Sequence, residues 1–132
     1  MMANLERSPQ PARMEAVSRD ALVQAALQEI NQNYREASLS NVARAYGVSL
    51  AYVSECVRAQ TGRTYKELLQ KHRMETAARL LRRSDLNIQQ IIAQVGYENT
   101  SYFYRLFHER YGLSPREYRL VRTGTAPRRP SA

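Results

Sequence analysis

The sequence repeats itself at an interval of about 50 residues, and this repeat constrains the fold more than any other feature. With a shift of 49, Leu39, Val42, Tyr46 and Gly47 align with Ile88, Ile91, Val95 and Gly96. With a shift of 50, Tyr52, Val53, Val57, Gly62 and Thr64 align with Tyr102, Phe103, Phe107, Gly112 and Ser114. Each copy predicts a short helix, a glycine turn, a second helix and a glycine stop, the pattern of a helix-turn-helix. A helical solenoid is the alternative, but two copies are too few for one, and the stretch between them does not repeat.

Capping residues and helical spacing predict an all-α domain of about seven helices. Ser18 precedes a helix whose apolar face holds Val23, Ala26, Leu27, Ile30 and Tyr34. Leu39, Val42, Ala43 and Tyr46 give the next helix a similar face. The predicted caps of this and three further helices are Ser38, Ser49, Asn87 and Asn99. Capping boxes at Thr64–Glu67 and Ser114–Glu117 begin a long helix and a final short one. We expect a disordered arm over 1–17, the tandem domain over 18–121 (modules 38–62 and 87–112, linker helix 65–83) and a basic tail over 122–132.

The net charge of +8 lies in the second half of the chain. Residues 1–57 hold 5 basic and 6 acidic side chains, whereas residues 58–132 hold 15 and 6. Of the 20 basic residues only Lys66 and Lys71 are lysines. This charge favours a polyanion as partner, either nucleic acid or an anionic membrane surface. Arginine holds phosphate bidentately, so its excess over lysine suits oriented phosphate contacts, although codon bias in a GC-rich genome would produce the same excess.

Two segments carry recognisable motifs, namely residues 96–119, GYENTSYFYRLFHERYGLSPREYR, and residues 39–62. The former resembles the C-terminal signature of the AraC/XylS-type family of transcription regulators, and the latter resembles the first module of this family. Arg73, Ala77, Leu80 and Leu81 match its linker helix. The resemblance implies a seven-helix, two-module DNA-binding domain, commonly attached to a sensor domain and commonly activating transcription through RNA polymerase. Seventeen residues before the first helix are too few for a ligand pocket, so we expect a domain that stands alone or is separated from its sensor.

The second helix of each module is expected to face DNA with its non-apolar side. The outward positions are Leu50, Ala51, Ser54, Glu55 and Arg58 in the first, and Thr100, Ser101, Tyr104, Arg105 and His108 in the second. Ala51 suits a thymine methyl, Ser54 most bases, and Glu55 the amino group of cytosine. Alternatively, Glu55 only repels wrong sites.

Arg105 is the strongest single candidate, because a guanidinium can bind guanine or clamp a phosphate. Arg58, Thr100 and Ser101 suit phosphates. Arg79, Arg82, Arg83 and His108 are weaker phosphate candidates, and the three arginines could instead only complement the dipole at the end of their helix. The aromatic cluster Tyr102, Phe103, Tyr104, Phe107 and Tyr111 could stack on single-stranded bases, but the spacing of its phenylalanines favours core packing.

The sequence predicts a cytoplasmic, monomeric regulator of double-stranded DNA, more an activator than a repressor, with RNA polymerase as a candidate partner. One cysteine and two histidines make a poor metal site, and we find no motif for catalysis, a cofactor or a membrane span. Three residues depart from the family's pattern: Glu55 stands at a frequent arginine, Val57 at the usual phenylalanine and Ile92 at a small residue. Glu55 and Ile92 motivate the alternative of a protein-interaction module whose DNA reading has decayed and which acts on polymerase or another regulator.

Overall fold

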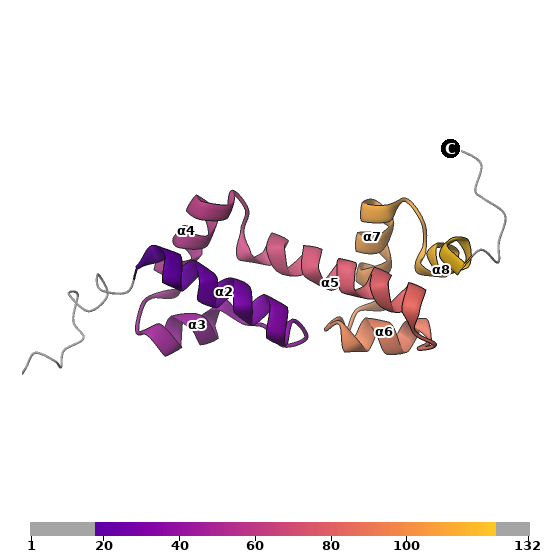
Figure 1. Cartoon of the computed structure of the whole chain (residues 1–132), viewed down its shortest axis with the longest axis horizontal. Helices are drawn as coiled ribbons and strands as arrows, with labels where there is room; N and C mark the ends of the chain where they lie inside the picture. Colours follow the sequence, from indigo (N-terminus) through magenta and orange to yellow (C-terminus); the bar gives the residue numbers. More distant parts are fainter. Residues whose placement is uncertain (1–17, 124–132) are drawn as a thin grey trace, which may run out of the picture. The chain divides into compact units, whose positions relative to one another are not determined.

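The computed structural model describes residues 18–123, which form seven α-helices and no strand (Figure 1). The helices are α2 (Arg19–Asn33), α3 (Leu39–Tyr46), α4 (Leu50–Thr61), α5 (Tyr65–Arg83), α6 (Ile88–Gln94), α7 (Thr100–Tyr111) and α8 (Pro115–Thr123). The predicted all-α class and the number of helices are confirmed for this part of the chain. The expected arm over 1–17 and the tail from 124 onward lie outside the described residues, while α8 continues through Thr123, into the predicted tail.

The helices begin at the capping residues that the sequence predicts. The hydroxyl of Ser18 accepts a hydrogen bond from the backbone N–H of Ala21, and Ser38, Ser49, Asn87 and Asn99 act in the same way at their helices. The Thr64–Glu67 capping box is closed by two reciprocal bonds of 3.0 and 3.1 Å. The Ser114–Glu117 box at α8 has the same two distances. Each cap satisfies backbone donors that a helix start would otherwise leave unpaired.

The second helix of each module ends at a glycine in the left-handed conformation. Gly62 has φ 77° after α4, and Gly112 has φ 73° after α7. Residues with a side chain rarely adopt this backbone conformation, so glycine is the residue that lets the chain leave the helix here. The two modules therefore share their stop signal as well as their caps.

The first compact unit extends to Leu69, and α2, α3 and α4 pack together within it. Its core is the cluster Leu22, Val23, Ala26, Leu39, Val42, Ala43, Val53, Cys56 and Val57. Leu27 and Tyr34 are only half-buried, and Leu22, which the predicted face of α2 omits, is fully buried. The expectation that Tyr46 faces the core is wrong: it is 41% exposed, because α3 ends there and the chain turns away at Gly47.

The second compact unit begins at Gln70, within α5, and has an aromatic core. Phe103 and Phe107 are fully buried, with ring centroids 5.8 Å apart, and Tyr118 of α8 lies edge-on to Phe107 at 5.4 Å. These two phenylalanines therefore pack the core and are not available for base stacking. Ile92 is 2% exposed and belongs to the same interior.

Candidate nucleic-acid interface

The second helix of the first module, α4, is the helix expected to face DNA, and we call it and its counterpart α7 the reading helices. It carries its core residues and its exposed residues on separate faces. Val53, Cys56 and Val57 are buried, with exposed fractions of at most 1%. The predicted contact residues Ala51, Ser54, Glu55 and Arg58 are all exposed, and Leu50 beside them is 49% exposed. The helix thus presents two small side chains, a carboxylate and a guanidinium to solvent.

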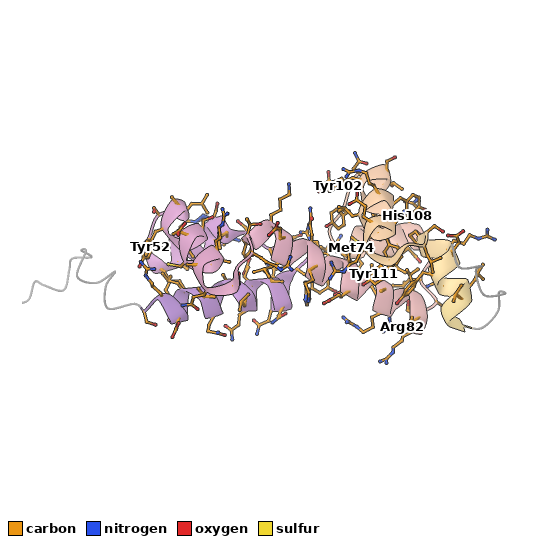
Figure 2. The ribbon with its side chains drawn as sticks, turned by 90° about the horizontal axis from the view of Figure 1, so that it is seen from above. Tyr52, Met74, Arg82, Tyr102, His108 and Tyr111 are labelled. Carbon is orange, nitrogen blue, oxygen red and sulfur yellow. The ribbon has the colours of Figure 1, made fainter. Side chains whose placement is uncertain are left out.

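The reading helix of the second module, α7, carries a more basic and more aromatic exposed face. Ser101, Tyr104, Arg105 and His108 are exposed, whereas Thr100 is half-buried at the N-terminus of the helix. Tyr104 retains 39% of its surface, so it is accessible although its ring lies 6.2 Å from that of the buried Phe103. Figure 2 labels Tyr102 and His108 on this helix.

Arg105 contacts neighbours that the sequence analysis did not name. Its guanidinium carbon lies 5.1 Å from the ring centroid of Tyr102, and one of its nitrogens lies 3.5 Å from a carboxylate oxygen of Glu109. The hydroxyl of Tyr102 in turn accepts a 2.7 Å hydrogen bond from the side-chain amide of Gln70 on α5. The spacing of three residues between Tyr102 and Arg105 on one helix was a signal for the first contact.

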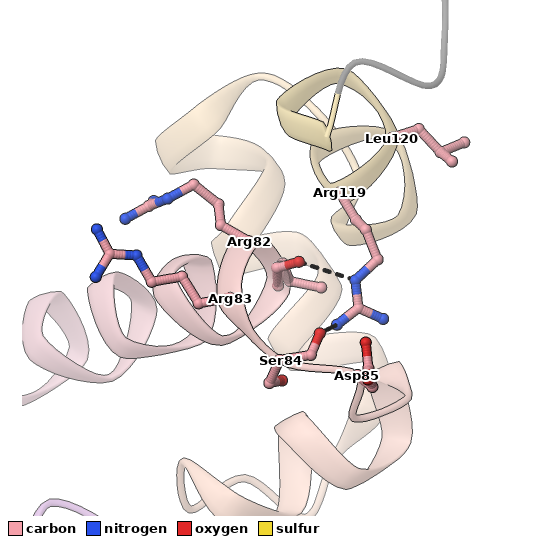
Figure 3. Close-up of a pocket in the computed structure, with 7 residues that line it drawn as sticks. Arg82, Arg83, Ser84, Asp85, Arg119 and Leu120 are labelled. Carbon is pink, nitrogen blue, oxygen red and sulfur yellow. Dashed lines mark hydrogen bonds between the residues drawn. The ribbon is translucent and has the colours of Figure 1, made fainter.

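The three candidate arginines at the end of α5 are exposed but differ in their partners. Arg82 donates a 2.9 Å hydrogen bond to the hydroxyl of Tyr118, and Arg79 makes a long contact of 3.5 Å with Thr76. Arg82 and Arg83 line an open cavity of about 500 Å³ beside α8 (Figure 3). Sequence reasoning missed Arg119 there, which donates to the carbonyl oxygens of Leu81, Ser84 and Leu80 at 2.9, 3.1 and 3.4 Å.

Glu75 of α5 makes one ion pair within its own helix and one with α7. Glu75 lies 2.9 Å from the ammonium of Lys71 and 3.6 Å from the guanidinium of Arg110. The hydrogen bond from Lys71 is the main reason that the pKa of Glu75 is lowered. Partial burial lowers the pKa of the adjacent His72, so this imidazole favours its neutral form.

Within residues 18–123, no three His, Cys, Asp or Glu side chains gather as a metal site would require. None of the helices described combines the length and the apolar character that crossing a bilayer requires.

A family described as a helix-turn-helix domain matches residues 42–120, a range that contains both reading helices and the helix between them. The chain belongs to the AraC/XylS-type helix-turn-helix family. The seven helices and their two aligned modules therefore correspond to the two-module domain of this family, as the resemblance implied.

Among curated proteins, this AraC/XylS-type domain is similar to the transcriptional activator NphR of a Rhodococcus species. The two are 37% identical over 92 residues, which cover 68% of this chain and 27% of NphR. The chain therefore spans about a quarter of the length of that relative.

Two solved structures share the fold. The C-terminal domain of AraT, a response regulator from Geobacillus stearothermophilus, is 36% identical with a TM-score of 0.71, covering 76% of this chain and 85% of that one. The DNA-binding domain of AdpA, a global transcriptional factor solved with a target DNA, has a TM-score of 0.69 over 78% of this chain and 93% of that one. At 20% identity, AdpA supports the fold alone.

Proposed function

We propose that this chain is a sequence-specific regulator of transcription that binds double-stranded DNA and activates its target genes. The observation that carries the proposal is the pair of exposed reading-helix faces on α4 and α7, each on a helix with a polar N-cap, one buried side and a left-handed glycine at its end. Family membership supports DNA as the ligand, and the activator NphR supports the sign of regulation.

We infer that one chain reads an asymmetric site through two successive major grooves. The helix α5 has 19 residues, or roughly 28 Å at 1.5 Å per residue, which is near the roughly 34 Å of one DNA turn. Two unequal reading helices on one chain would then recognise on the order of 20 bp as a monomer.

The proposed roles follow from the chemistry of each exposed group. On α4, Ala51 contacts a thymine methyl, Ser54 a base, Glu55 the amino group of cytosine and Arg58 a phosphate. On α7, Arg105 binds guanine or clamps a phosphate, and Thr100, Ser101 and Tyr104 contact the DNA around it. Arg79, Arg83 and His108 are proposed as secondary phosphate contacts, together with Arg82, whose bond to Tyr118 leaves other donors of its guanidinium available.

The remaining assignments are also proposals. We infer that the chain acts in the cytoplasm, where bacterial DNA lies, that RNA polymerase is its protein partner during activation, and that it has no catalytic role of its own. The alternative, a protein-interaction module with decayed DNA reading, is not favoured, because both reading faces retain groups suited to bases and phosphates and because of the similarity to an activator.

Selection from a pool of random duplexes tests this proposal. The full chain should enrich one asymmetric motif, and the logarithm of its affinity should fall with the logarithm of salt at about −0.9 per phosphate neutralised. Replacing Arg105 by alanine should weaken binding to the selected site by about 1–3 kcal/mol if the arginine binds a base there. A chain that protects all sequences equally, or enriches none, contradicts the proposal and favours the interaction module.

A further inference from the structure

We propose that Tyr102 is a positioning residue that holds the guanidinium of Arg105 ready for DNA. The inference rests on the proposed function, since it concerns how the strongest contact residue of α7 is presented. It gives a role to a half-buried tyrosine that lies between the core and the reading face.

Two contacts link the linker helix to the guanidinium of Arg105, and a third packs the Tyr102 ring that lies between them. Gln70 of α5 donates its amide hydrogen to the Tyr102 hydroxyl at 2.7 Å, which fixes the outer end of the ring. The centroid of the Tyr102 ring also lies 5.9 Å from that of the buried Tyr97, in a T-shaped arrangement. The guanidinium carbon of Arg105 lies over this ring, 5.1 Å from its centroid, within the range of a cation–π interaction.

Such support matters because an unrestrained arginine side chain samples many rotamers. When it binds, it is restricted to one of them, and this costs conformational entropy. Arg105 is 62% exposed, so without the ring little else restrains it on that side. The Glu109 carboxylate lies 3.5 Å away on the next turn, and it would repel DNA phosphates. The ring restrains the guanidinium without placing a competing negative charge beside it.

The first module shows that this arrangement is specific to α7. Tyr52 occupies the repeat position of Tyr102, but Glu55 replaces arginine three residues later. The ring of Tyr52 instead lies 5.7 Å from the guanidinium of Arg19 on α2. Tyr52 is therefore the counterpart of Tyr102 in the first module, but it supports an arginine of α2 and none of α4.

A double-mutant cycle on the selected duplex tests the inference. Tyr102→Leu should weaken binding about two- to fivefold, the strength expected of an exposed cation–π contact, and should have almost no effect in the Arg105→Ala background. Tyr102→Phe keeps the ring but loses the hydroxyl that accepts from Gln70, so it should weaken binding less than Tyr102→Leu, and this smaller effect should also vanish without Arg105. The control Tyr52→Leu should change affinity by the same factor whether or not Arg105 is present. Circular dichroism establishes that each variant is folded.

An equal effect of Tyr102→Leu with and without Arg105 would show a merely structural role and overturn the inference. Should that variant fail to fold, Gln70→Ala provides the same comparison, because it releases the ring without removing it, and its effect should also vanish without Arg105. Failure of the proposed function looks different: the unmodified chain would then enrich no motif at all.

Discussion

The three hydrogen bonds from Arg119 predict a measurable contribution of α8 to stability. Two of them, at 2.9 and 3.1 Å, have good lengths, whereas the third, at 3.4 Å, is too long to contribute much. A bond from a charged donor contributes about 1.5–3 kcal/mol, but these half-buried carbonyls regain water when the arginine is removed. Counting about 1 kcal/mol for each good bond, Arg119→Ala should lower the free energy of unfolding by about 2 kcal/mol.

For a domain of this size, that decrease lowers Tm by roughly 8–16 °C. Urea unfolding combined with hydrogen exchange is the suitable assay, because exchange at the amides of α6 and α8, which lie wholly in the second unit, reports on that unit alone. Arg116→Ala is the matched control: it removes the same charge from an exposed position of the same helix. If both variants unfold at the same urea concentration, the carbonyl contacts contribute nothing and the reasoning is refuted.

Three further predictions concern the second unit. Gly112→Ala should lower stability by about 1–2 kcal/mol in thermal unfolding, because φ is 73° while an added Cβ meets no atom within 4 Å. Glu109→Gln should raise DNA affinity severalfold in low-salt titrations, with the gain shrinking as salt rises, because it removes a negative charge beside Arg105. The pKa of His72 is lowered by burial, so the unfolded chain takes up the proton first as the pH falls below about 6.5. The free energy of unfolding should therefore decrease as the pH is lowered from 7 to 5. Urea unfolding should show a weaker pH dependence for His72→Gln than for the unmodified chain.

The sequence predicted the helix boundaries well because the signals that set them are local. A cap such as Ser49 bonds the N–H of Tyr52 only three residues away, and a stop such as Gly62 needs only its own backbone conformation. Both can be recognised without knowing what packs against the helix. The outward set on α4 followed from the helical period, since Ser54 and Glu55, between the buried Val53 and Cys56, must face away from the core.

Contacts between distant helices could not be predicted in this way. Arg119 and Leu81 are 38 residues apart, and Gln70 and Tyr102 are 32 apart, so nothing in the local pattern indicates that they meet. Tyr46 fitted the apolar period of α3 but is exposed, because periodicity does not reveal where the packing partners of a helix end. The DNA contacts of the exposed residues remain predictions for the same reason. The helical period determines which side chains face solvent, but it does not determine what those side chains bind.

The separation of cap, core and reading positions on α4 and α7 has a consequence for redesign. Positions 51, 54 and 55 are neither caps nor core residues, and the same holds for positions 101, 104 and 105. An α4 carrying the outward side chains of α7 would therefore keep every cap and every buried contact of its own unit. Such a chain would present one chemistry twice, and its preferred operator should change from two unequal halves to a direct repeat.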